Sequence, residues 1–384
     1  HLEVTPDARQ HLDSCLLCEE CSHVCPSGVE MERLGVAFRD EFKIQNSKFK
    51  IQWTLVERFA YGWLFGDLGH FRTAARALRW YQRSGSQWLA RKLGIVRLLG
   101  LAEAERLLPE IPPRFVVPED AAATGQCSVF AGCIMSTAFA PTTEHTAELL
   151  GVFGCKASFP AGQVCCGALQ LHAGEAERAR ELARANLDAF AGDAPIVVNA
   201  AGCGAMLKHY EQLLPEDPRA QAFTARVKDV SEFLAERQPS KAPREVRRTV
   251  ALQDACHLLH AQHIDRAPRK LLRAIPGLEL REMAEPGLCC GSAGIYNVTH
   301  RQASAELQRR KCANIEKTGA ELVVTGNPGC LLQIRAGLPE SVEVEHIVDV
   351  LWEAFCHPEQ SEGPSSSEPE RSFVAVAPQD DMPG

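Results

Sequence analysis

Cysteine is the residue whose number and spacing point most directly to chemistry in this sequence. The 384 residues include 16 cysteines, about 4% of the chain, whereas a disulfide scaffold carries more than ~8%. Two pairs are adjacent, Cys165–Cys166 and Cys289–Cys290, and adjacent cysteines form a disulfide only across a strained peptide. We therefore expect reduced thiolates that bind metal, rather than the eight disulfides of a secreted protein.

The first four cysteines lie close together, in the run CLLCEECSHVCP. Cys15, Cys18 and Cys21 follow one another at steps of three, and Cys25 precedes Pro26. Bacterial ferredoxins bind a [4Fe–4S] cluster with a run of this kind. The alternative is structural zinc, which usually pairs two separated cysteine or histidine halves. The run therefore favours a [4Fe–4S] cluster.

The fourth cysteine of this run has two candidate roles. In ferredoxins with two clusters, the last cysteine of each run ligates the other cluster. The chain holds one run and begins with His1 instead of methionine, so we expect a first run upstream, with Cys25 as a ligand of that missing partner. In a protein with a single cluster, Cys25 would complete its own site.

Eight further cysteines belong to an internal repeat. VFAGC, VCCGALQLHAG and IVVNAAGCGAML in the first copy match VALQDACH, LCCGSAGIYNV and LVVTGNPGC in the second. The cysteines of the two copies are Cys133, Cys165, Cys166 and Cys203, and Cys256, Cys289, Cys290 and Cys330. Three matching pairs are offset by 123, 124 and 127 residues, and such nearly constant spacing indicates a duplication.

The elements that must position these cysteines follow from the pattern between them. Short β-branched runs (Val197–Val198, Val323–Val324) alternate with amphipathic stretches at 174–190 and 300–317. This alternation predicts βαβ units, and hence a small parallel sheet with flanking helices in each copy. The cysteines lie where a strand ends, which is where parallel sheets collect their ligands. We therefore expect the cysteines of each copy to converge.

The cysteine spacing also carries a resemblance. Cys-x31-Cys-Cys-Gly-x35-Cys and Cys-x32-Cys-Cys-Gly-x38-Cys resemble the cysteine-rich CCG domain of heterodisulfide reductase and its relatives. With the ferredoxin run and the phrases AAGCGAMLKHY, DACHLLHAQ, CCGSAGIYN and TGNPGC, about residues 5–355 most closely resemble the iron–sulfur subunit of glycolate oxidase (glycolate dehydrogenase). The resemblance implies a separate FAD-containing subunit that oxidises glycolate or a similar 2-hydroxy acid.

The chain departs from the full CCG motif, which ends in CxxC. Met206 and Gln333 stand where a last cysteine would follow Cys203 and Cys330. Each copy could then hold an ordinary [4Fe–4S] cluster, or one copy, most readily the first, a zinc ion. The departure counts against a second function, a thiol–disulfide redox catalyst like heterodisulfide reductase. A third candidate function is that of a zinc-stabilised scaffold with one functional cluster.

Other cysteines and histidines are expected to play no part in metal binding. Free cysteine packs as a small hydrophobe, so we predict buried structural roles for Cys127, Cys155, Cys312 and Cys356. We predict hydrogen-bonding or surface roles for the three histidines of CHLLHAQH, namely His257, His260 and His263.

A basic, aromatic segment follows the ferredoxin run. Residues 36–100 carry twelve Lys and Arg against four Asp and Glu, together with Trp53, Trp63, Trp80 and Trp88. The segment predicts amphipathic helices. One interpretation is a docking surface for a membrane or a partner subunit. The other, favoured for most of these residues, is that the aromatic rings pack the helices around the ferredoxin cluster.

Together these patterns predict an α/β protein with a small α-helical ferredoxin-type domain and two tandem CCG domains. The expected parts are the ferredoxin-type domain at 1–35, the helical segment at 36–115, the CCG domains at 125–240 and 247–356, and a disordered tail at 357–384. The tail is rich in Pro, Ser and Glu.

Composition narrows the functions that remain. The net charge of −8 argues against nucleic-acid binding, and no apolar run is long enough to span a membrane. Without a dinucleotide fingerprint or P-loop, we expect FAD only in a partner subunit and no catalytic residue here. The sequence thus predicts a cytoplasmic electron-transfer subunit that passes electrons from the FAD subunit to a quinone or other carrier. We also consider a peripheral contact of this subunit with the inner face of the membrane. The alternative complexes to which it could belong are lactate and glycerol-3-phosphate dehydrogenases.

Overall fold

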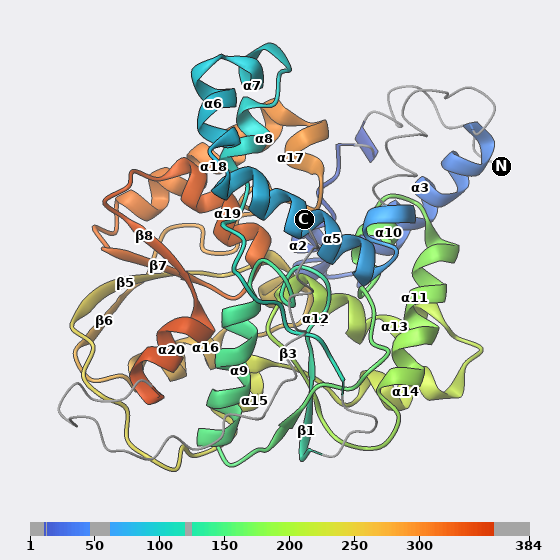
Figure 1. Ribbon diagram of the computed structural model, residues 1–384. Helices are drawn as coiled ribbons and strands as arrows, with labels where there is room; N and C mark the ends of the chain where they lie inside the picture. Colours follow the sequence, from blue (N-terminus) through green and yellow to red (C-terminus); the bar gives the residue numbers. More distant parts are fainter. Residues whose placement is uncertain (1–10, 13, 47–61, 120–124, 357–384) are drawn as a thin grey trace, which may run out of the picture.

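The computed structural model describes residues 11–12, 14–46, 62–119 and 125–356 (Figure 1). Two α/β units follow one another along the chain, and helices of the N-terminal part contact both of them. The predicted tail at 357–384 and Trp53 lie outside the described residues.

The first unit is built on a four-stranded sheet whose strands are all parallel, in the order β2-β1-β3-β4. The strands are β1 (Cys127–Phe130), β2 (Ala157–Ser158), β3 (Ile196–Val198) and β4 (Val227–Asp229). The central strands β1 and β3 are buried along their whole length, because helices cover both faces of such a sheet. Val197 in β3 lies in register with Val129 on one side and Lys228 on the other.

The helices of the first unit connect these strands. They are α9 (Ala140–Val152), α10 (Ala168–His172), α11 (Ala176–Ala189), α12 (Ala201–Lys208), α13 (Tyr210–Leu213), α14 (Pro218–Thr224) and α15 (Val230–Ala235). Helix α11 occupies most of the stretch predicted at 174–190.

The second unit repeats this plan with the strand order β6-β5-β7-β8, again all parallel. Its elements are β5 (Arg248–Gln253), η2 (His257–Ala261), α16 (Arg266–Arg273), β6 (Leu278–Arg281), α17 (Tyr296–Thr299), α18 (Arg301–Glu316), β7 (Leu322–Thr325), α19 (Pro328–Gly337), β8 (Glu343–His346) and α20 (Ile347–Phe355). Helix α18 falls in the stretch predicted at 300–317. The expected duplicated α/β architecture is confirmed.

The two units share one hydrophobic core. Helix α9 packs against α20, and α15 packs against α16 (Figure 1). Phe153 and Phe355 meet edge to face with 5.3 Å between ring centroids, and His145 Nδ1 lies 2.8 Å from Asp349 Oδ1. Because each pair joins one helix of each unit, the units are held in a fixed orientation with their cysteine-bearing edges together.

The N-terminal part adds α2 (Glu20–His23), α3 (Met31–Asn46), α5 (Leu68–Arg83), α6 (Ser86–Lys92), α7 (Ile95–Leu98) and α8 (Ala102–Arg106). Helices α6 and α7 project away from the sheets (Figure 1). Trp80 and Trp88 are 68% and 63% exposed, so the interpretation that the tryptophans pack these helices together is wrong for both. Within the described residues, none of the helices combines the length and the apolar character that crossing a membrane would take.

Candidate metal centre

The eight cysteines of the duplication lie at one edge of each sheet. In both units the first cysteine closely follows the first strand, the adjacent pair follows the next strand, and the last lies in the first turn of α12 or α19. All eight line a single cavity of about 290 Å³ between the units: Cys133, Cys165, Cys166, Cys203, Cys256, Cys289, Cys290 and Cys330. The predicted convergence therefore extends across both copies.

In the first copy the thiols form two close pairs. The sulfur atoms of Cys133 and Cys165 are 3.8 Å apart, and those of Cys166 and Cys203 are 3.4 Å apart. Tyr210 Oη donates a hydrogen bond to the carbonyl oxygen of Cys166 at 2.8 Å. This bond fixes the backbone of the adjacent pair from within the core.

In the second copy, polar groups contact the sulfur atoms directly. The backbone N–H of Gly291 donates to Cys289 Sγ at 3.4 Å, and Asn327 Nδ2 donates to Cys330 Sγ at 3.3 Å. Donors of this kind stabilise negative charge on sulfur. Lys311 is fully buried, and its amine donates to the carbonyl oxygens of Glu285 and Pro286 at 3.1 and 2.8 Å.

The glycine after each adjacent pair lets a helix approach the turn. Gly167 and Gly291 have φ of 86° and 87°, a region that favours glycine. A Cβ atom on Gly291 would lie 2.6 Å from the carbonyl oxygen of Ser304 in α18, and one on Gly167 would lie 3.4 Å from Cα of Ala179 in α11. The glycines therefore bring the cysteine turns against these two helices.

Crowding and burial control the ionisation of these thiols. The contact with Cys165, followed by burial, raises the pKa of the Cys133 thiol well above its ordinary value. The contact with Cys289, followed by burial, does the same to the pKa of Cys256. Packed thiols in an apolar cavity lose their protons together only where a positive group offsets their charge. The donor set therefore fits a metal group held by several thiolates.

The spacing of the sulfur atoms can be compared with that around a single metal ion. Tetrahedral zinc with Zn–S bonds of about 2.3 Å places its sulfur ligands about 3.8 Å apart. Among the described residues, no three cysteine sulfurs lie within 4.8 Å of one another. The sulfur atoms of each cysteine set are therefore spread more widely than the four ligands of one tetrahedral ion.

The positions that lack the last CCG cysteine are filled by packed side chains. Met206 is buried in the core of the first unit. Gln333 is buried as well, where its amide donates to Ser304 Oγ at 3.1 Å and accepts from Asn297 Nδ2 at 3.3 Å. Neither residue lines the cavity, so each copy offers four thiols.

The ferredoxin run lies against the second unit. Leu17 and Glu19 have φ of 52° and 62°, unusual values for residues other than glycine. Burial raises the pKa of Cys18 to about 11, and the nearby Cys256 contributes to this rise. At the other end of the run, the backbone N–H groups of Val29 and Ser27 lower the pKa of Cys25.

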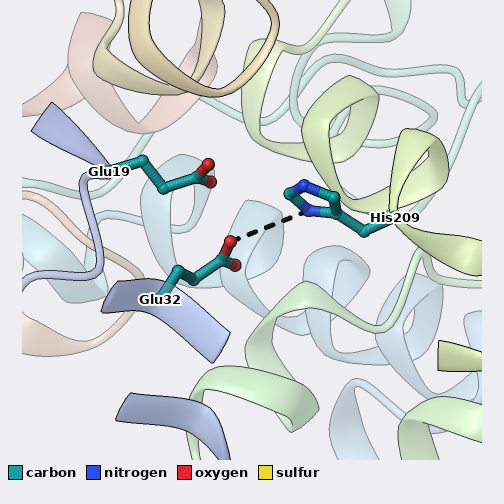
Figure 2. A group of neighbouring side chains, drawn as sticks. All are labelled: Glu19, Glu32 and His209. Carbon is teal, nitrogen blue, oxygen red and sulfur yellow. Dashed lines mark ion pairs between the residues drawn. The ribbon is translucent and has the colours of Figure 1, made fainter. Parts of the chain in front are cut away.

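A cluster beside this run was not predicted from the sequence. Figure 2 shows the side chains of Glu19, Glu32 and His209 directed toward one another, and their ligand atoms lie within 4.8 Å. Glu32 Oε1 is also 3.6 Å from His172 Nε2.

The two carboxyl groups of this cluster differ in ionisation. Burial, then the charge of Glu32, raises the pKa of Glu19 to about 9. Burial also acts to raise the pKa of Glu32, but the contact with His172 and the charge of His209 lower it to about 2. Opposite shifts of two adjacent carboxyl groups favour a pair that shares one proton.

Two cysteines outside these sets are paired. The structure joins Cys127 in β1 to Cys155 in a disulfide, with Cα atoms 6.3 Å apart. Both are buried, as predicted, but they are paired instead of free, because the return of the chain from α9 to β2 brings Cys155 beside β1. Cys312 and Cys356 are free. Of the three histidines, His260 donates to the carbonyl oxygen of Gly287 at 3.1 Å, whereas His257 Nδ1 lies 3.8 Å from Cys256 Sγ.

Comparison with known proteins places the chain in a family. Residues 127–208 and 250–335 match the family described as "Cysteine-rich domain" (CCG), and residues 53–108 match "Glycolate oxidase iron-sulfur subunit, linker region". The lactate utilization protein A of Shouchella clausii is 29% identical over 58% of this chain and 97% of its own length.

Two relatives match nearly the whole chain. The probable glycolate oxidase iron–sulfur subunit of Bacillus subtilis is 39% identical over 93% of this chain and 85% of its own length. The glycolate oxidase iron–sulfur subunit of Escherichia coli is 30% identical over 92% of this chain and 84% of its own length. The chain therefore belongs to the family of glycolate oxidase iron–sulfur subunits.

Proposed function

We propose that this chain is the electron-transfer subunit of a glycolate oxidase complex. It accepts electrons from a partner subunit that contains FAD and passes them to a quinone or other carrier. The observation that carries the proposal is the single cavity lined by eight cysteines from two equivalent sheet edges. Family membership supports it, because the relatives are named as iron–sulfur subunits of glycolate oxidase.

The proposed ligands are the twelve cysteines of the three sets. They are Cys15, Cys18, Cys21 and Cys25 in a ferredoxin-type domain, Cys133, Cys165, Cys166 and Cys203 in the first copy, and Cys256, Cys289, Cys290 and Cys330 in the second. Each set would hold a [4Fe–4S] cluster, which supplies reversible one-electron transfer. The chain supplies burial, which excludes water, and donors to sulfur, which tune the reduction potential.

Zinc in the first copy is the alternative within this proposal. The width of the sulfur sets argues against it, since one tetrahedral ion needs sulfurs about 3.8 Å apart throughout. The close Cys133–Cys165 and Cys166–Cys203 pairs, at 3.8 and 3.4 Å, are the feature that a zinc site would use.

We further propose a cytoplasmic location with a peripheral membrane contact at α6 and α7. Trp88 and Leu98 are 63% and 87% exposed, and Arg91, Lys92 and Arg97 lie among them. Exposed apolar side chains interspersed with basic ones suit an anionic lipid surface. Co-sedimentation with anionic phospholipid vesicles tests this part, and Leu98→Asp should weaken the binding.

Metal analysis of protein purified without oxygen, in complex with its FAD subunit, tests the central proposal. We expect about four iron atoms and as many acid-labile sulfides for each of the three cysteine sets, and clusters that become reduced when glycolate is added. Zinc in both copies with iron in the ferredoxin run alone would overturn it and favour a zinc-stabilised scaffold.

A further inference from the structure

The duplication places an equivalent residue in each copy six positions after the second cysteine of the adjacent pair. In the first copy this residue is His172, the last of α10, and in the second it is Tyr296, the first of α17. Both contact the N-terminal part of the chain. They differ in which segment of it they hold, and that difference determines which copy lies nearest the ferredoxin run.

Tyr296 holds the ferredoxin run itself. It is only 8% exposed, and its hydroxyl donates a hydrogen bond to the carbonyl oxygen of Ser14 at 3.0 Å. Ser14 immediately precedes Cys15. On the other side, α17 begins six residues after Cys290, so one tyrosine ring connects two cysteine-bearing segments.

The other end of the run also rests on the second copy. His23 Nδ1 and His263 Nδ1 share a hydrogen bond at 3.0 Å, and the two rings are stacked 5.0 Å apart. The His23 ring lies 5.3 Å from that of His260. His260 is hydrogen-bonded to the carbonyl oxygen of Gly287, two residues before Cys289. Segment 14–23 is thus held at both ends by the second copy.

The first copy approaches the middle of the run with His209, whose ring lies within 4.8 Å of Glu19, but it reaches the loop at Cys15 through an intermediate residue. His172 Nε2 faces Glu32 in α3, and its carbonyl oxygen accepts a hydrogen bond from Arg39 Nη1 at 2.9 Å. Arg39 Nη2 in turn donates to the carbonyl oxygen of Cys15 at 2.6 Å. His172 therefore anchors α3, whereas Tyr296 contacts the loop that carries the first cysteine.

We propose that Tyr296 is a positioning residue that seats the ferredoxin run on the second CCG copy, which makes this copy the relay between the ferredoxin site and the first copy. This inference rests on the proposed electron-transfer function. The cysteines of each site would hold a redox group, and in the relay step one electron would pass from the reduced group of one site to the oxidised group of the next, with no bond formed or broken. The step between the two copies crosses their shared cavity.

The test uses the complete iron-loaded complex with Tyr296→Phe, Tyr296→Leu and the matched variant His172→Gln. Removing one hydrogen bond should make amide hydrogen exchange in segment 14–25 about fivefold faster in Tyr296→Phe. Tyr296→Leu also removes the ring, and should abolish the magnetic interaction between the reduced ferredoxin and second-copy clusters in EPR spectra. His172→Gln should leave that interaction intact.

The outcomes separate this inference from the function on which it rests. A wild-type complex without cluster signals would overturn both. Clusters that are present, with exchange and magnetic interaction unchanged in both Tyr296 variants, would overturn the seating role alone. Equal loss of the interaction in His172→Gln and Tyr296→Leu would overturn the relay order. Tyr296→Phe keeps the ring and its packing, so it gives a result even where Tyr296→Leu fails to fold.

Discussion

The two copies of the duplication share a geometry and differ in charge. Strand order and cysteine placement are the same in both. The buried Lys311 of the second copy, however, stands where the first has the buried Asn186, and Val250 stands where the first has the disulfide-bonded Cys127. Duplication thus provides two equivalent sites, and substitutions around them can give the two sites different reduction potentials.

The largest effect is expected from removing one ligand in each copy. Cys290→Ser and Cys166→Ser should each abolish the cluster of their own copy, a loss of about four iron atoms per chain. Cys312→Ser, at a buried cysteine outside the sets, should keep the full iron content. Zinc lost from Cys166→Ser in place of iron would show that the copies differ in metal as well as in charge.

The glycines after the adjacent pairs should differ in their tolerance of a side chain. In Gly291→Ala, left-handed strain and the overlap with Ser304 should cost about 3 kcal/mol. In Gly167→Ala, strain alone should cost about 1–2 kcal/mol, since the nearest atom is 3.4 Å from the added Cβ. Thermal unfolding of the loaded proteins measures both, and a larger loss in Gly167→Ala would contradict the geometry.

The residues that precede the last helix of each unit should give opposite pH dependences. Asp229 caps α15 and His346 caps α20, and both are buried. Burial raises the pKa of Asp229 to about 6, so the folded state binds a proton more tightly than the unfolded state between about pH 4 and 6. Raising the pH through this window should therefore remove up to about 3 kcal/mol of stability.

Burial lowers the pKa of His346, so the unfolded state binds its proton more tightly and stability should fall as the pH drops below about 6.5. Melting temperatures between pH 4.5 and 7 test this comparison. Asp229→Asn should steepen the rise of stability with pH, and His346→Gln should flatten it. The same slope in both variants would contradict the opposite signs.

The smallest effect is expected from Lys311→Met. Reduction adds negative charge to a cluster, so removing a nearby buried cation makes reduction less favourable. The potential of the second-copy cluster should fall by roughly 40–90 mV, equivalent to about 1–2 kcal/mol. A redox titration followed by EPR measures it, with Leu187→Met, next to the equivalent Asn186, as the control in the first copy. Equal shifts in both clusters would mean that Lys311 does not distinguish the copies.

The parts of the fold that depend on local pattern could be predicted from the sequence. The runs around Val197 and Val323 are β-branched and short, and the cysteines follow at fixed distances, so both parallel sheets and the position of the thiols at their edges could be inferred. The repeat also indicated that the two sites would be alike.

The parts of the structure that depend on contacts between residues far apart in the sequence could not be predicted. Glu19 and His209 are 190 residues apart, and no spacing rule connects them. Cys127 and Cys155 could be paired only once the turn before β2 was known. The exposure of Trp88 was missed because an amphipathic pattern predicts a helix and an apolar face, but not whether another part of the chain covers that face.

The cavity between the units has a consequence for the rate of electron exchange under the proposed function. Apart from the thiols, much of its wall is apolar, with contributions from Leu16, Phe65, Phe130, Leu169 and Ile295. Such walls hold few dipoles that must turn when the charge of a site changes, and the polar groups that touch sulfur are fixed in place by the fold. Little rearrangement therefore accompanies each transfer, so electrons could move between the copies with only a small difference in potential to drive them.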